Sequence, residues 1–160
     1  MILKKELIKN ELFIYTDGSC HAQKRTGTWV AIILHGVEKI ILQGSEVNTT
    51  HNRMELMAVI KGVEYAGNNM DAGIVMHVVT DSQYVVGLPE RRAKLEADNF
   101  ITKQGKDLQN SDLLKILFYL FSNHTVQLSK IRAHQKHNGT INYNIEADKL
   151  SRGMMRQLIN

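Results

Sequence analysis

Short apolar runs separated by polar segments indicate five β-strands in this chain. Leu12 to Thr16 is almost wholly apolar and rich in residues that favour strands, which predicts a strand buried on both faces. Ile74 to Val79 has the same character. The other three predicted strands span Thr28 to Leu34, Glu38 to Gln43 and Thr125 to Ile131. His35-Gly36 is typical of a tight hairpin, so the first three strands along the chain are expected to form an antiparallel meander.

Apolar residues three and four positions apart indicate helices elsewhere. Asn52 to Gly67 is predicted as a helix whose apolar stripe consists of Leu56, Val59, Ile60 and Val63. The last predicted helix runs from Asn144 to about Leu158. Its inward face is expected to carry Ala147, Leu150, Met154 and Leu158.

The remaining helical signals are shorter. Ser111 or Asp112 can cap a helix that continues through Phe121. Ser82 to Leu88 is predicted as a short helix that ends at Pro89, the only proline. Residues 90–110 are polar and charged, and we expect short helices and loop there. A run of strands followed by strand–helix alternation predicts an α/β fold with a mixed sheet flanked by helices.

Length and composition favour one cytoplasmic domain. The 160 residues suit a single domain spanning 1–160, and 43% hydrophobic with 22% charged residues argues against disorder. No apolar stretch approaches the roughly 20 residues of a membrane span. Met1 to Glu11 is expected to be a short charged extension without a signal core, so we expect no export. The single Cys20 fits a reducing compartment.

The basic excess is concentrated near the carboxyl end. Residues 1–120 contain 14 basic and 14 acidic residues, whereas residues 121–160 contain 6 basic and 2 acidic residues. A polyanion is a plausible partner for such a surface. An ordinary solvated basic face explains the charge equally simply, so charge alone does not assign a partner.

Four carboxylates stand at positions where a soluble protein seldom buries charge. Asp17 and Asp81 close the two apolar strand runs, and Glu55 and Asp148 lie beside the apolar stripes of two predicted helices. Converging carboxylates are costly to bury unless a cation lies between them. Ligands that are all oxygen suit Mg²⁺, which takes one or two carboxylates together with waters and a substrate phosphate. The pattern indicates a divalent-metal site for phosphate chemistry.

Each of these carboxylates also has an ordinary structural interpretation. Asp17 can end a strand in an Asx turn, and Asp81 can cap the next helix. Glu55, three residues after Asn52, fits a capping box, and Asp148 suits the first turns of a helix. No single position decides between the two interpretations. One metal-binding cleft, however, accounts for all four.

With these motifs in place, the chain resembles type 1 ribonuclease H from about Leu12 to Arg156. The matching blocks are Tyr-Thr-Asp-Gly-Ser-Cys at 15–20, Asn-Arg-Met-Glu-Leu-Met-Ala at 52–58 and Thr-Asp-Ser-Gln-Tyr-Val at 80–85. Ala-His at 133–134 and the block from Asn144 to Leu150 follow in the family's order. The resemblance implies a five-stranded mixed sheet, three antiparallel strands followed by parallel ones, with helices on both faces.

The resemblance also implies an activity and a set of site residues. The activity is endonucleolytic hydrolysis of the RNA strand in an RNA/DNA hybrid, leaving 5′-phosphate and 3′-hydroxyl ends. Two Mg²⁺ ions, for which Mn²⁺ is expected to substitute, would be held by Asp17, Glu55, Asp81 and Asp148. His134 corresponds to the family's loop histidine, with His137 as a rival. The positions implied to touch the hybrid are Gly18, Ser19, Cys20, Gln23, Thr50, Asn52, Gln83 and Asn144.

Some positions depart from the family's pattern. His51 stands where an asparagine is frequent, and Gln23 takes the place of a substrate-contacting asparagine. Residues 89–110 correspond to a basic, tryptophan-containing protrusion of some relatives, but they contain no tryptophan and several acidic residues. A monomer without an obligate protein partner is expected.

Two other functions compete with hybrid cleavage. The first alternative is that the chain is another nuclease or a strand-transferase on the same fold. A comparison of hybrid, duplex DNA and branched DNA as substrates would distinguish this function from hybrid cleavage. The other is that of an inactive hybrid-binding module, which the presence of all four carboxylates disfavours.

Overall fold

A five-stranded mixed sheet forms the centre of the protein in a computed structural model that describes residues 10–131 and 142–160. The strands are β1 (Glu11–His21), β2 (Thr26–His35), β3 (Glu38–Val47), β4 (Val75–Thr80) and β5 (Thr125–Lys130). Their order across the sheet is β3-β2-β1-β4-β5. β1 and β3 run antiparallel to β2, and β4 runs parallel to β1 and β5. The predicted fold class is confirmed.

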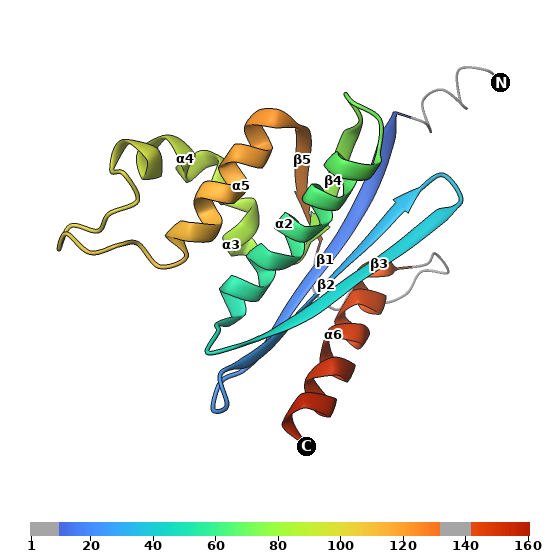
Figure 1. The fold of residues 1–160 in the computed structure, drawn as a ribbon, viewed down its shortest axis with the longest axis horizontal. Helices are drawn as coiled ribbons and strands as arrows, with labels where there is room; N and C mark the ends of the chain where they lie inside the picture. Colours follow the sequence, from blue (N-terminus) through green and yellow to red (C-terminus); the bar gives the residue numbers. More distant parts are fainter. Residues whose placement is uncertain (1–9, 132–141) are drawn as a thin grey trace.

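Helices cover both faces of this sheet (Figure 1). They are α2 (His51–Asn69), α3 (Gln83–Val86), α4 (Leu88–Ala97), α5 (Ser111–Asn123) and α6 (Tyr143–Ile159). Because strand side chains alternate between faces, β1 places Leu12 and Ile14 in the core under α2. β2 turns Val30 and Ile32 the other way, against Ala147 of α6. The α2 face also carries α5, which packs against α2.

The prediction that the first strand is buried on both faces was wrong for its first half. Phe13 is 41% exposed, whereas Leu12 and Ile14 on either side of it are fully buried. On that face, Ala147 of α6 packs with Val30 and Ile32 of β2, which pair with Asp17 and Tyr15 of β1. The helix therefore covers β1 beyond Phe13. Phe13 instead stacks on His77 of the neighbouring β4, with the ring centroids 4.8 Å apart.

Two helices begin at residues other than those expected. Thr50 caps α2, because its hydroxyl accepts a hydrogen bond from the Arg53 backbone at 3.2 Å, so Asn52 lies inside the first turn. α5 follows Asn110, which has the left-handed conformation with φ 65°. Asp112 is committed elsewhere, because its carboxylate accepts two hydrogen bonds from the Arg53 guanidinium.

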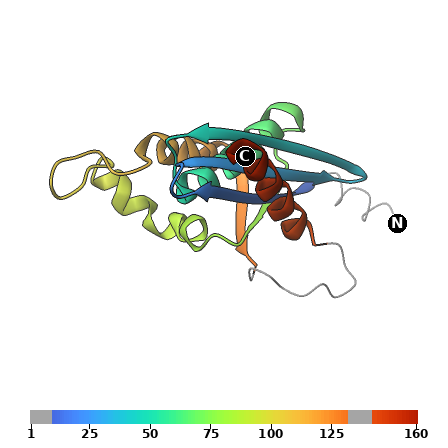
Figure 2. The same ribbon diagram turned by 90° about the horizontal axis from the view of Figure 1, so that it is seen from below.

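Pro89 begins a helix and does not end one as predicted. The short helix α3 ends at Val86, and Pro89 lies in the first turn of α4. Proline suits that place because the first turn has no use for its missing N–H group. α4 and the following segment, residues 98–110, project from one end of the molecule in both views (Figure 2).

The buried face of α6 is rotated from the predicted one. Ala147, Ser151 and Met155 are buried, whereas Leu158 is 50% exposed. The rotation follows from a polar contact that apolar periodicity does not register. The Ser151 hydroxyl and the Thr28 hydroxyl lie 2.9 Å apart in the buried layer between α6 and β2.

Among the helices of residues 10–131 and 142–160, none combines the length and apolar character that crossing a membrane requires.

Candidate metal centre

Asp17 lies where two central strands separate, not at a strand end. The parallel pairing of β1 with β4 finishes at Tyr15 and Val79, but β1 continues alongside β2 and pairs Asp17 with Val30. An Asx turn at Asp17 is therefore ruled out. On the β4 side, Asp81 directly follows the last strand residue, and Ser82 rather than Asp81 caps α3. Both carboxylates are thus free of the structural roles considered for them.

Glu55 reaches the same place from α2 because β1 has no side chain at Gly18. A Cβ atom at Gly18 would lie 2.5 Å from the Glu55 backbone nitrogen and 2.6 Å from the Met54 carbonyl carbon. The glycine therefore allows the helix to approach the strand closely. With Thr50 as the cap, Glu55 falls beyond the first turn, so a capping-box role for it is wrong.

Replacing Gly18 with alanine is expected to damage both stability and activity. The added methyl group meets backbone atoms that cannot rotate away, so α2 must shift and carry Glu55 with it. We expect a loss of about 1–3 kcal/mol in the free energy of unfolding and a clear drop in catalytic rate. Urea unfolding and initial-rate kinetics measure the two effects. Gly153→Ala is the control for an added methyl group, because no heavy atom of the described residues, apart from neighbouring helix backbone, lies within 4 Å of that position and its φ is not positive. An active, fully stable Gly18→Ala protein would contradict the close approach.

One carboxylate oxygen from each of Asp17, Glu55 and Asp81 lies within 4.8 Å of the other two. Asp17 and Glu55 are almost fully buried, and each has a buried oxygen, Asp17 Oδ2 and Glu55 Oε2, without a hydrogen-bond partner among the described residues. Unsatisfied buried carboxylate oxygens are costly. Because the donors are all oxygen and need positive charge, these residues fit a divalent cation of the Mg²⁺ type.

Burial and the repulsion between neighbouring carboxylates raise the pKa values of Asp17 and Glu55. Burial, followed by the charges of Glu55, Asp81 and Asp148, raises the pKa of Asp17 to about 8. Burial also raises the pKa of Glu55, although contacts with His51 and the Gly18 backbone partly oppose this effect. In the absence of a cation, the centre therefore holds protons at pH values where ordinary carboxyl groups are ionised.

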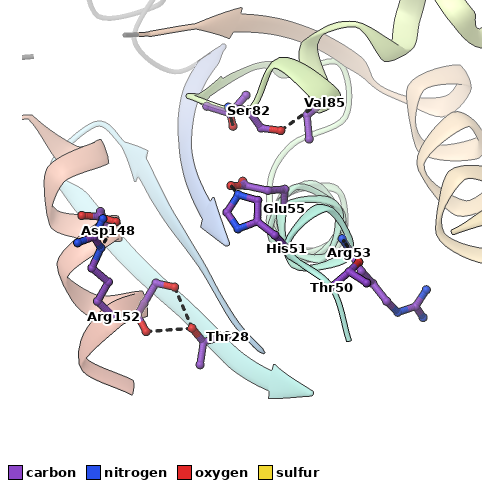
Figure 3. A network of polar contacts seen from close by, with 11 residues as sticks. Thr28, Thr50, His51, Arg53, Glu55, Ser82, Val85, Asp148 and Arg152 are labelled. Atoms are coloured by element: carbon purple, nitrogen blue, oxygen red, sulfur yellow. Dashed lines mark hydrogen bonds and ion pairs between the residues drawn. The ribbon is translucent and has the colours of Figure 1, made fainter. Parts of the chain in front are cut away.

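Asp148 does not join this close group. It lies on α6, and its Oδ1 accepts a hydrogen bond of 3.0 Å from Nε of Arg152, one turn further along the helix. Figure 3 shows this pair on α6, with His51 and Glu55 on α2 on the other side of the site. The charge of Asp148 nevertheless raises the pKa of Asp17. The structure thus brings three of the four predicted carboxylates together and leaves the fourth facing them from another element.

The positions expected to touch nucleic acid occupy varied surroundings. Thr50 uses its hydroxyl to cap α2, and the Cys20 thiol lies 3.5 Å from the Thr49 carbonyl oxygen. The Gln83 side chain accepts a hydrogen bond of 2.9 Å from Lys130. Asn144 donates to the Val79 carbonyl at 3.4 Å, and its buried Oδ1 has no hydrogen-bond partner within residues 10–131 and 142–160.

The other expected contacts differ mainly in exposure. Gly18 is buried, Ser19 is partly buried, Asn52 is exposed, and Gln23 is exposed in the turn at residues 22–25. His134 and its rival His137 lie outside the described residues, so their predicted roles stay predictions.

Two residues beside the carboxylates were missed by sequence reasoning as members of the site. His51 contacts Glu55, with 3.3 Å between Nε2 and Oε1, and Arg152 contacts Asp148. The signal was present in both cases, because each partner lies four residues from its carboxylate and shares its helix face. His51 had been noted only as a departure from a common asparagine.

Comparisons with known proteins agree with this arrangement. The family model described as RNase H matches residues 9–156. A ribonuclease H of Pseudomonas fluorescens is 39% identical over 140 residues, 86% of this chain and 87% of the relative. A ribonuclease H of Caldicellulosiruptor saccharolyticus is 32% identical over 92% of this chain and 98% of its own length.

A solved structure shows the same fold. The crystal structure of LC9-RNase H1, described as a type 1 RNase H with the type 2 active-site motif, superimposes with a TM-score of 0.76. The match covers 91% of this chain and 72% of that one, at 22% identity. The family match extends over nearly the whole chain, and it includes the strands and helices that carry the acidic centre. The chain therefore belongs to the ribonuclease H family and is a nuclease of the hydrolase class.

Proposed function

We propose that this protein is an endonuclease that hydrolyses the RNA strand of RNA/DNA hybrids and leaves 5′-phosphate and 3′-hydroxyl ends. The observation that carries the proposal is the meeting of Asp17, Glu55 and Asp81 within 4.8 Å, where β1 and β4 separate. Membership of the ribonuclease H family supports the choice of substrate. We further propose that the protein acts as a monomer in the cytoplasm.

In this proposal, Asp17, Glu55, Asp81 and Asp148 hold two Mg²⁺ ions, for which Mn²⁺ can substitute. Two such ions supply an activated water and stabilise the departing 3′ oxygen of an in-line displacement. Asp17 would be one of these ligands, because one of its carboxylate oxygens lies within 4.8 Å of those of Glu55 and Asp81. Asp148 would have to break its ion pair with Arg152 in order to bind an ion. The cost is small, because a surface pair of this kind contributes only about 0.3–0.5 kcal/mol.

Polar groups around the centre are suited to hold the hybrid. Thr50, Asn52 and the first backbone N–H groups of α2 are available for phosphate oxygens at a helix amino terminus. Gln83 and Asn144 flank Asp81 and Asp148 in the sequence. Short polar side chains of this kind can bind the RNA 2′-hydroxyl through the wide minor groove, which distinguishes RNA from DNA. His134 would carry protons or assist product departure.

Cleavage of a labelled hybrid in Mg²⁺ tests the proposal. We expect cleavage of the RNA strand only, loss of activity when EDTA removes the metal, and recovery when Mg²⁺ is added in excess. Duplex RNA, duplex DNA and branched DNA serve as parallel substrates. Equal cleavage of duplex RNA would overturn the hybrid assignment, and preferred cleavage of branched DNA would favour a resolvase. End-labelling of the products with kinase and ligase establishes the 5′-phosphate and 3′-hydroxyl ends.

A further inference from the structure

His51 and Glu55, two residues of metal-ligating type, contact each other on one face of α2. Their spacing of four residues places both side chains on the same side of the helix, and Figure 3 shows the imidazole against the carboxylate. The distance from His51 Nε2 to Glu55 Oε1 is 3.3 Å. Helices commonly present paired metal ligands with this spacing. The pair differs from the rest of the centre because it offers nitrogen.

The distance between the two donors fits joint coordination of one ion. Two ligands that each lie about 2.1 Å from a metal are roughly 3.0 Å apart at a right angle and roughly 3.4 Å apart at the tetrahedral angle. The observed 3.3 Å falls between these values. The side chain of His51 is 63% exposed, and that of Glu55 is 2% exposed. An ion can therefore reach the imidazole from solvent while the buried carboxylate fixes its position.

The need for positive charge at Glu55 is independent of His51. Among the described residues, neither the buried Glu55 Oε2 nor the buried Asp17 Oδ2 has a hydrogen-bond partner. Contact with the imidazole leaves both of these oxygens unsatisfied. A hydrogen bond from His51 to Glu55 is thus insufficient to complete the centre, whereas a cation that His51 helps to bind would complete it.

We propose that His51 is a nitrogen ligand of this metal centre, shared with Glu55, and that it gives the protein a preference for imidazole-accepting transition ions such as Co²⁺ over Mg²⁺. The proposal rests on the proposed function only in taking Glu55 as a metal ligand. Imidazole raises affinity for these ions, whereas Mg²⁺ prefers oxygen and keeps its waters. A centre with asparagine in place of His51 would lack this selectivity.

The chain contains a matched control for this pair. His77 and Glu11 also lie with Nε2 and Oε1 3.3 Å apart, but Glu11, unlike Glu55, is not one of the three clustered carboxylates. Removing either histidine deletes the same histidine–carboxylate contact at the same distance. Only the loss of His51 should alter metal binding.

The test uses the whole protein without nucleic acid at about pH 8, because metal binding requires unprotonated imidazole. Pulsed electron paramagnetic resonance of bound Mn²⁺ reports a directly coordinated ¹⁴N nucleus. Calorimetric titration with Co²⁺ and with Mg²⁺ reports selectivity. We expect the wild-type protein and His77→Asn to show the nitrogen coupling and His51→Asn to lack it. We also expect His51→Asn to bind Co²⁺ about 10-fold more weakly, with Mg²⁺ affinity unchanged within about 2-fold.

A coupling that persists in His51→Asn, or a wild-type spectrum without nitrogen, would overturn the proposal. So would equal losses of Co²⁺ and Mg²⁺ affinity, because they would show that His51 only orients Glu55. Circular dichroism confirms that the variants are folded. Hybrid cleavage in Mg²⁺ is measured separately. If cleavage is present without nitrogen coupling, only the role of His51 fails, and if coupling is present without hybrid cleavage, only the proposed function fails.

Discussion

Asp17→Asn is expected to reduce hybrid cleavage about 1,000-fold or more while leaving hybrid binding intact. Asparagine has nearly the same shape but no charge, so it cannot act as an anionic ligand between the other carboxylates. One oxygen of Asp17 lies within 4.8 Å of oxygens of Glu55 and Asp81, so the substitution removes an anionic ligand from this group. A loss of about 4 kcal/mol of transition-state stabilisation corresponds to roughly this factor in rate.

Single-turnover rates and hybrid affinity separate the two consequences. Hybrid affinity depends mostly on contacts with phosphates, so it should be unchanged or slightly tighter once a negative charge is removed. Glu64→Gln is a matched control, because it also removes one carboxylate charge, but from the part of α2 that pairs with Lys61. Cleavage by Asp17→Asn within 10-fold of wild type would refute the assignment of Asp17. A parallel loss in Glu64→Gln would attribute the effect to net charge.

The sequence was sufficient to predict the sheet and the close approach of three carboxylates, those of Asp17, Glu55 and Asp81. All five predicted strands are present, including β3 and β5, which contain no fully buried residue. The convergence of Asp17 and Asp81 followed from their positions after the parallel-pairing segments of β1 and β4. Periodicity did not reveal that β1 continues past Asp17 to His21, since residues 18–21 are small or polar and pair with β2 on one side only.

Details that depend on contacts between distant residues were not predictable. The face of α6 is set by Ser151 against Thr28, more than 120 residues away in sequence, and no local pattern marks that serine as buried. Asp112 does not cap α5, because its carboxylate accepts a hydrogen bond from Arg53 of α2. Asp148 was expected in the cluster, but Arg152 on the same helix holds it. That last contact was visible as a four-residue spacing and was overlooked.

Asp17→Asn is also expected to make the metal-free protein more stable at neutral and alkaline pH. Because the pKa of Asp17 is raised to about 8 in the folded state, the folded protein keeps a proton that the unfolded chain has released. The stability linked to this group is fully present below about pH 4 and is lost as pH rises through about 8. Asparagine has no proton to lose and makes the same contacts at every pH.

The difference in free energy of unfolding between Asp17→Asn and wild type should therefore be near zero at about pH 4. It should grow to about 2–4 kcal/mol at about pH 8, the cost of leaving a buried carboxylate charged among like charges. Urea unfolding in EDTA across this range measures it. Glu64→Gln, unfolded in parallel, shows what the loss of a carboxylate elsewhere on α2 does to stability. Saturating Mg²⁺ should reverse the order at pH 8, since a bound cation stabilises only the folded protein that retains its ligand. A difference that is constant with pH would mean that Asp17 is ionised throughout, and the centre would then need no cation to hold its charge.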